Sequence, residues 1–215
     1  MTTIAPLTRT DTVVRKARIG TIGAVLWTLS STVWAASEIE AQPFGSLAFV
    51  AVAVAWWICM VVAPLLVVVG HYALLAALGP AAGRVGRTGV GASAVGLAAM
   101  GLGIGIEVAS MSAGGGEVSV GHTILLIGFL VVLLGSLVTG VTVIRRLAGT
   151  ATRIAGWLLV LALPLGLAIG FLGSLIAPEN DAVFWAVLTV PIGVAWVLLG
   201  RSVAAEARNT AVPAR

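Results

Sequence analysis

The sequence predicts an all-α protein embedded in a membrane: one bundle of six transmembrane helices with both termini in the cytoplasm. Of the 215 residues, 60% are hydrophobic and only 9% are charged, whereas a soluble domain carries about 25% charged residues. The mean hydropathy is +1.13. Six apolar stretches approach or exceed the roughly 20 residues with which a helix crosses a bilayer. These observations exclude the soluble globular, fibrous and disordered classes.

Turn residues or charges bound each predicted span. Gln42-Pro43 separates the first two spans, Gly79-Pro80 the next two, and three glycines at 114–116 the third from the fourth. Two arginines follow the fourth span, and a short polar segment at 178–181 separates the last two. The predicted spans are 19–36, 46–78, 88–106, 123–144, 154–177 and 182–200, between cytoplasmic tails at 1–18 and 201–215.

The positive charges fall on one side of this arrangement. All twelve Lys and Arg residues lie in the two tails or in the loops after the second and fourth spans. The other three loops carry only acidic charges: Glu38, Glu40, Glu117, Glu179 and Asp181. Because cytoplasmic loops are enriched in Lys and Arg, the pattern places both termini inside and would break with five or seven spans. A cleavable signal peptide ending near residue 36 is the competing interpretation, but its apolar stretch exceeds the usual 7–15 residues.

The second span is longer than a bilayer requires. Its 33 residues would form a helix about 50 Å long at about 1.5 Å per residue. We therefore expect the helix to tilt, to kink at Pro64, or to continue into the cytoplasm along the membrane surface. In the last case, His71 and Tyr72 lie near the inner lipid headgroups.

The chain contains a candidate internal repeat at an offset of 100 residues. The segment Trp57–Pro64 aligns with Trp157–Pro164, and Gly70 aligns with Gly170. A duplication of three spans would invert one half relative to the other and place helix breaks at the two prolines, as in many transporters. The alternative is a chance alignment of two proline-containing apolar helices, since proline is common in transmembrane helices.

Small residues predict where the helices pack closely. Lipid provides no hydrophobic drive for helix association, so close backbone approach at small residues becomes important. The third and fifth spans contain GxxxG patterns, and the fourth carries glycines seven residues apart on one face. The predicted packing glycines are Gly101, Gly105, Gly128, Gly135, Gly166 and Gly170. These glycine faces could pack against other helices of the same chain, against a second copy in a homo-oligomer, or against a membrane partner protein.

Glu107 and His122 are the residues that we expect to form a ligand or proton site. An ionisable group within a membrane span is costly and is therefore a candidate for function. Glu107 lies about 26 Å along the third span, and His122 opens the fourth span at the same level. The short glycine-rich loop lets the two meet, and Glu38, Glu40 and Asp181 would join them from other loops. Alternatively, Glu107 only extends to water and His122 lies among the headgroups.

No motif indicates an enzyme, and we predict no catalytic residue and no cofactor. The patterns HExxH, GxSxG and the P-loop are absent. The single cysteine, Cys59, excludes a cysteine-based metal site. The two histidines are predicted on opposite sides of the membrane, so no metal site is expected.

Two functions remain open. The chain is either a small transporter or permease-type component for a small or lipophilic solute, or a non-catalytic membrane subunit that docks a partner through its glycine faces. Its basic residues flank the spans and form no stripe, which argues against nucleic acid. Eleven arginines against one lysine, with abundant Ala and Gly, suggest a bacterial protein of the cell membrane.

Overall fold

The computed structural model describes residues 9–36, 42–176 and 181–209, and they form helices joined by short connections. The elements are α1 (Arg9–Ala36), α2 (Leu47–Trp56), the π-helix η1 (Trp57–Val62), α3 (Ala63–Leu78), the 3-10 helix η2 (Gly79–Ala82), α4 (Gly83–Ser112), α5 (Ser119–Arg146), α6 (Thr150–Ile176) and α7 (Asp181–Asn209). These ranges contain no β-strand.

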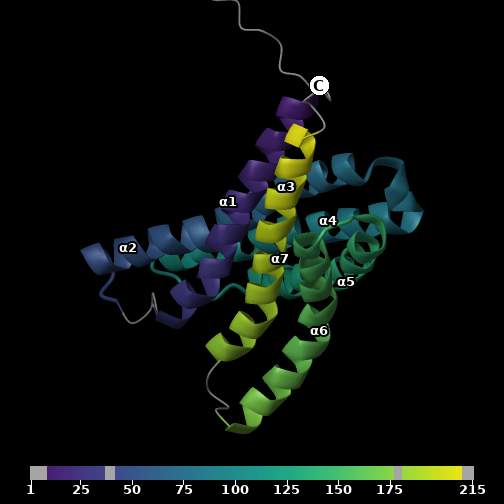
Figure 1. Ribbon diagram of the computed structural model, residues 1–215. Coiled ribbons are helices and arrows are strands. Elements are labelled where there is room, and N and C mark those ends of the chain that lie inside the picture. Colours follow the sequence, from purple (N-terminus) through teal and green to yellow (C-terminus); the bar gives the residue numbers. More distant parts are fainter. Residues whose placement is uncertain (1–8, 37–41, 177–180, 210–215) are drawn as a thin grey trace, which may run out of the picture.

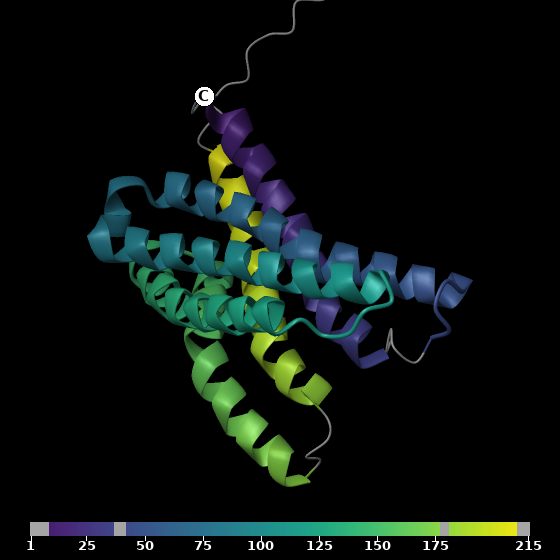
Figure 2. The same cartoon turned by 180° about the vertical axis from the view of Figure 1, so that it is seen from behind.

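Four helical stretches within these ranges are long and apolar enough to cross a membrane: Leu47–Ser112, Ser119–Arg146, Thr150–Ile169 and Trp185–Asn209. The first has 66 residues and reverses direction at η2, so that α4 runs back along α3 (Figure 2). The chain is therefore an all-helical protein suited to a membrane. The first of these stretches contains two predicted spans, 46–78 and 88–106. The predicted span 19–36 lies in α1, which is not among the four stretches, so the predicted count of six spans is not established.

The helices form two layers that cross each other. One layer, the steep layer, consists of α1, α6 and α7 (Figure 1). The other layer consists of the α2–η1–α3 stretch, α4 and α5, which lie side by side in Figure 2. The most extensive contacts join α4 to α5 and α1 to α7. The helix α3 packs against α1 and α4, and α6 packs against α5 and α7.

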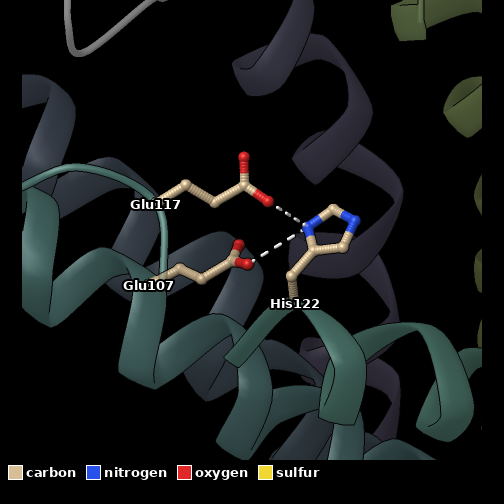
Figure 3. A group of neighbouring side chains, drawn as sticks. All are labelled: Glu107, Glu117 and His122. Carbon is tan, nitrogen blue, oxygen red and sulfur yellow. Dashed lines mark ion pairs between the residues drawn. The ribbon is translucent and has the colours of Figure 1, made fainter. Parts of the chain in front are cut away.

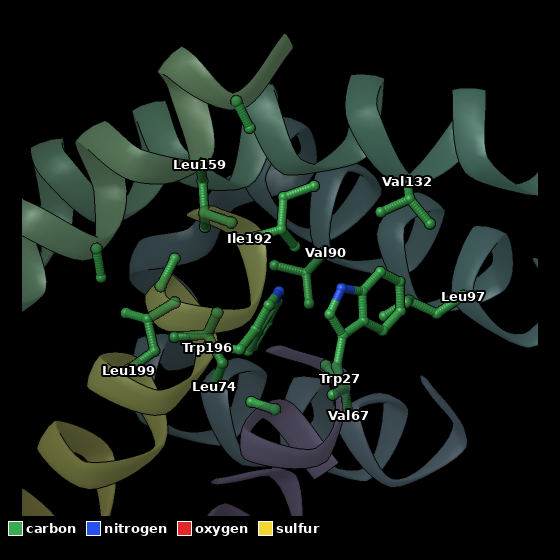
Figure 4. Packing of buried hydrophobic residues seen from close by; sticks show 14 of the residues in the cluster. Trp27, Val67, Leu74, Val90, Leu97, Val132, Leu159, Ile192, Trp196 and Leu199 are labelled. Atoms are coloured by element: carbon green, nitrogen blue, oxygen red, sulfur yellow. The ribbon is translucent and has the colours of Figure 1, made fainter. Parts of the chain in front are cut away.

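The core between the layers is built mainly from apolar side chains. Trp27 and Trp196 lie at its centre, 2% and 3% exposed, among aliphatic side chains from both layers (Figure 4). The cavity between Gly20, Gly70 and Trp196 measures about 10 Å³, the lower limit for one water molecule. Large apolar side chains on α2, α5 and α6 point outward instead, where lipid can contact them.

The long second span widens before Pro64 without breaking. The N–H of Ala63 bonds to the carbonyl of Ile58, five residues earlier, and residues 57–62 form a π-helix. In an α-helix the proline ring would clash with the carbonyl of Met60, four residues back, and the wider π turn relieves that clash. The helix α6 continues as an α-helix through Pro164. Neither predicted break position ends a helix.

The two halves of the chain pair their helices in corresponding order. The contacts of α1 with α3 and of α3 with α4 correspond to those of α5 with α6 and of α6 with α7. The α1–α7 contact has its counterpart in α5–α4. Any ring in which each span packs against the next one along the chain, and the last against the first, gives this correspondence, so the order alone does not indicate a duplication. In addition, α3 contacts α7, whereas the equivalent pair, α6 and α4, makes no contact of comparable extent among the described residues.

Glycines bring the helices of this one chain together. Five predicted packing glycines lie at such contacts: Gly128 and Gly135 of α5 against α4, Gly101 and Gly105 of α4 against η1 and α3, and Gly166 of α6 against α7. The contacts of Gly170, the sixth predicted glycine, are not among those that the structure describes. One close approach was not predicted: α1 crosses α3 with the backbones of Gly20 and Gly70 in contact. The glycine faces are therefore used inside the chain.

Candidate functional site

Two carboxylates and an imidazole converge where α4 passes into α5 (Figure 3). The Nδ1 atom of His122 lies 3.2 Å from Oε1 of Glu107 and 2.9 Å from Oε1 of Glu117. One potential ligand atom from each residue lies within 4.8 Å of the other two. This set, the Glu–Glu–His cluster, contains the predicted pair Glu107 and His122 and adds Glu117.

Glu107 reaches the cluster from the packed interface between α4 and α5. Its side chain is 7% exposed. The opposite residue on α5 is Gly121, where a Cβ would lie 3.0 Å from Cγ of Glu107, so the glycine leaves space for the carboxylate's stem. Apart from the ion pair with His122, the buried Oε1 of Glu107 has no hydrogen-bond partner among the described residues. An isolated buried charge is costly, and the imidazole is the group that offsets it.

The loop between α4 and α5 holds Glu117 beside the other two residues. Gly114 adopts a φ of +79°, which glycine reaches without strain and which commonly ends a helix. The N–H of Gly115 donates to the carbonyl of Ser110 at 2.9 Å, and Oγ of Ser110 donates to the carbonyl of Gly116 at 2.8 Å. These bonds turn the chain back over the end of α4 just before Glu117.

His122 lies in the first turn of α5, where its N–H donates to the carbonyl of Val118 at 3.0 Å. Its side chain is 44% exposed and that of Glu117 is 59% exposed, so solvent reaches the cluster from one side. A carboxylate oxygen only accepts, so in this arrangement Nδ1 carries the proton. A single N–H therefore faces two carboxylates, of which Glu107 is buried and Glu117 is also open to solvent.

The other predicted companions of the pair cannot be placed. Glu38 and Glu40 lie outside the described residues, and the side chain of Asp181 is not described. Sequence reasoning missed Glu117, although its position in a short glycine-rich loop, five residues before His122, was the available signal.

His71 is buried inside the bundle. It is 1% exposed, because α3 is enclosed by α1, α4 and α7 along this face. Its Nδ1 donates to the carbonyl of Val67 at 2.9 Å, so Nε2 accepts from Oγ of Ser93 at 3.0 Å. The ring lies 3.8 Å from that of Trp196. Both nitrogens are satisfied, so this histidine has a packing role, while Tyr72 is 57% exposed.

Comparison of the chain with protein-family models, with curated proteins and with solved structures finds no match. The argument for function therefore rests on the geometry of the Glu–Glu–His cluster and of the bundle that carries it.

Proposed function

We propose that this protein is a small transporter or permease-type component whose cation or proton site is the Glu–Glu–His cluster. The observation that carries the proposal is the convergence of two carboxylates and an imidazole at one end of an otherwise apolar bundle. Ionisable groups that face the interior of a membrane bundle commonly belong to substrate or ion pathways.

The proposal includes six spans, two cytoplasmic termini and a location in the cell membrane of a bacterium. The segregation of all twelve basic residues to one side supports this orientation, which places the cluster on the outer face. Single cysteines in a Cys59→Ala background test it. A membrane-impermeant maleimide should label Gly116→Cys in intact cells and should label Arg146→Cys only after lysis. The reverse pattern would overturn the orientation.

Transport would require the two layers to move. The cavity beside Trp196 has room for about one water molecule, which fits a closed state of the proposed transporter. An opening between the steep layer and the layer of α3, α4 and α5 would give a solute access to the interior.

Flux through purified, reconstituted protein tests the transport function. Liposomes would contain a pH-sensitive dye or a zinc-sensitive dye, and a potassium diffusion potential would drive protons or Zn²⁺ inward. We expect influx above that of empty liposomes, lost in Glu107→Gln and retained in the neighbouring control Thr123→Ala. Absence of both proton and Zn²⁺ flux, with the potential in either direction, would refute the proposal.

The docking function has no observation in its favour. Five of the six glycines on which it depended lie at contacts within the chain and are not available to a partner unless the bundle opens. We therefore do not propose a partner protein.

A further inference from the structure

We infer that the Glu–Glu–His cluster binds a divalent transition-metal ion, with Zn²⁺ the best fit, through Glu107, Glu117 and Nδ1 of His122. The inference deepens the proposed function by naming the class of cation that the site recognises. It departs from the expectation of no metal site, which considered cysteine and the two histidines but not a histidine combined with two carboxylates.

The distances within the cluster suit a small tetrahedral ion. Zn²⁺ binds nitrogen and oxygen ligands at about 2.0–2.1 Å, so two ligands of a tetrahedral site lie about 3.3–3.4 Å apart. The two nitrogen–oxygen distances here are 3.2 and 2.9 Å, and the ligand oxygens of the two carboxylates lie within 4.8 Å of each other, so a bound ion would draw the three groups into place. On binding, the lone pair of Nδ1 coordinates the ion, and the one proton of the neutral imidazole moves from Nδ1 to Nε2.

The buried carboxylate is the strongest indication of a ligand. Oε1 of Glu107 points into the cluster, is buried, and has no hydrogen-bond partner among the described residues apart from its ion pair. Buried polar atoms are nearly always hydrogen-bonded, and an exception calls for an explanation such as an ion. A coordinated cation would satisfy this buried oxygen directly, whereas the single imidazole N–H is shared with Glu117.

The donor set selects a transition metal over calcium or magnesium. Ca²⁺ takes 6–8 oxygen ligands at about 2.3–2.6 Å, and Mg²⁺ requires a near-octahedral oxygen shell. The cluster offers two carboxylates and one imidazole. Imidazole suits zinc, copper, iron and nickel, and mixed nitrogen and oxygen ligation is ordinary for zinc.

The site would keep one coordination position open. Three protein ligands leave the fourth position of a tetrahedral ion for water or a solute, unlike the closed shell of structural zinc sites. His122 and Glu117 are partly exposed, so an ion could enter and leave from the solvent side. Such a site fits the entrance of a transport path.

Zinc titration of the full chain in detergent tests the inference. The protein would carry an affinity tag without histidines, and binding would be measured by calorimetry. We expect one Zn²⁺ per chain and reversal by a chelator. His122→Gln and Glu107→Gln should each weaken binding at least tenfold, Glu117→Gln several-fold, and the control Thr123→Ala should bind like the unaltered chain.

If Glu107→Gln does not fold, the two exposed positions carry the test. Zn²⁺ should also raise the midpoint of thermal unfolding of the unaltered chain, because a ligand that binds only the native state stabilises it, and this shift should disappear in His122→Gln. No saturable binding, or binding that is unchanged in both His122→Gln and Glu117→Gln, would overturn the inference. Because binding is measured at equilibrium and transport as flux, zinc bound without flux would refute the transport function and leave the metal site standing.

Discussion

Replacing Gly128 with alanine should destabilise the bundle, whereas the same change at Gly91 should not. A Cβ on Gly128 would lie 2.6 Å from the backbone nitrogen of Met100 and 2.9 Å from the carbonyl oxygen of Gly96. Both atoms belong to the backbone of α4, so no side-chain rotation can relieve the contact. A Cβ on Gly91, which also lies in α4, would meet no atom within 4 Å.

The magnitude follows from the separation that the new methyl group forces. Carbon atoms pack at about 3.5–4.0 Å, so α4 and α5 must move apart by roughly 1 Å, which forfeits a quarter to a half of the local contact energy. Overpacking costs about 1–3 kcal/mol, and a rigid backbone obstacle favours the upper end. The better helix propensity of alanine offsets about 1 kcal/mol. Gly128→Ala should therefore lower the free energy of unfolding by about 2 kcal/mol, roughly thirtyfold in the unfolding equilibrium. Gly91→Ala has no overpacking cost and gains only from the better helix propensity of alanine.

Reversible unfolding by SDS in mixed micelles, followed by circular dichroism and tryptophan fluorescence, measures both changes. Gly128→Ala should unfold at a lower SDS fraction than the unaltered chain, and Gly91→Ala at the same or a slightly higher one. Equal stability of the two variants would refute the argument, because it would mean that the α4–α5 contact is not limited by glycine.

Three further changes probe other parts of the structure. Ser93→Ala leaves Nε2 of His71 buried without a donor and should cost about 1–3 kcal/mol, measured by the same SDS unfolding. Ser110→Ala removes the hydrogen bond to the carbonyl of Gly116 and should weaken zinc binding several-fold in calorimetry, with only a small change in the unfolding midpoint. Cys59 is buried at 8% exposure, so a maleimide should label it only after unfolding; rapid labelling of the native protein would contradict its place in the packing.

Hydropathy located the apolar part of each helix, but local backbone chemistry decided where the helices end. The predicted span 123–144 lies within α5, and 88–106 lies within the longer α4. A helix continues past its apolar stretch until a residue leaves the helical conformation. Around α4 this happens at Gly83 and Gly114, which adopt φ values of +61° and +79°. Glycine spacing could not by itself indicate which of the many glycines occupy such positions.

The proximity of Glu107 and His122 was predictable because a short loop joins two antiparallel helices and limits how far apart their ends can be. The contribution of Glu117 was not, since it depends on the hydrogen bonds of Ser110 that turn the loop back. The burial of His71 was not predictable for a similar reason. Its position along the chain suggested an interface, but the packing of α3 against three other helices buries it.

The sequence by itself determined the membrane class, the helical content and the one-sided distribution of basic residues, because these depend on composition and on the local run of apolar side chains. Only the tertiary structure decided that the glycine faces meet within one chain and that α1 crosses α3 at Gly20 and Gly70. It also decided that two carboxylates share one imidazole. Each of these features depends on distances between segments far apart in sequence or on the exact turn of a loop, and hydropathy carries no information about either.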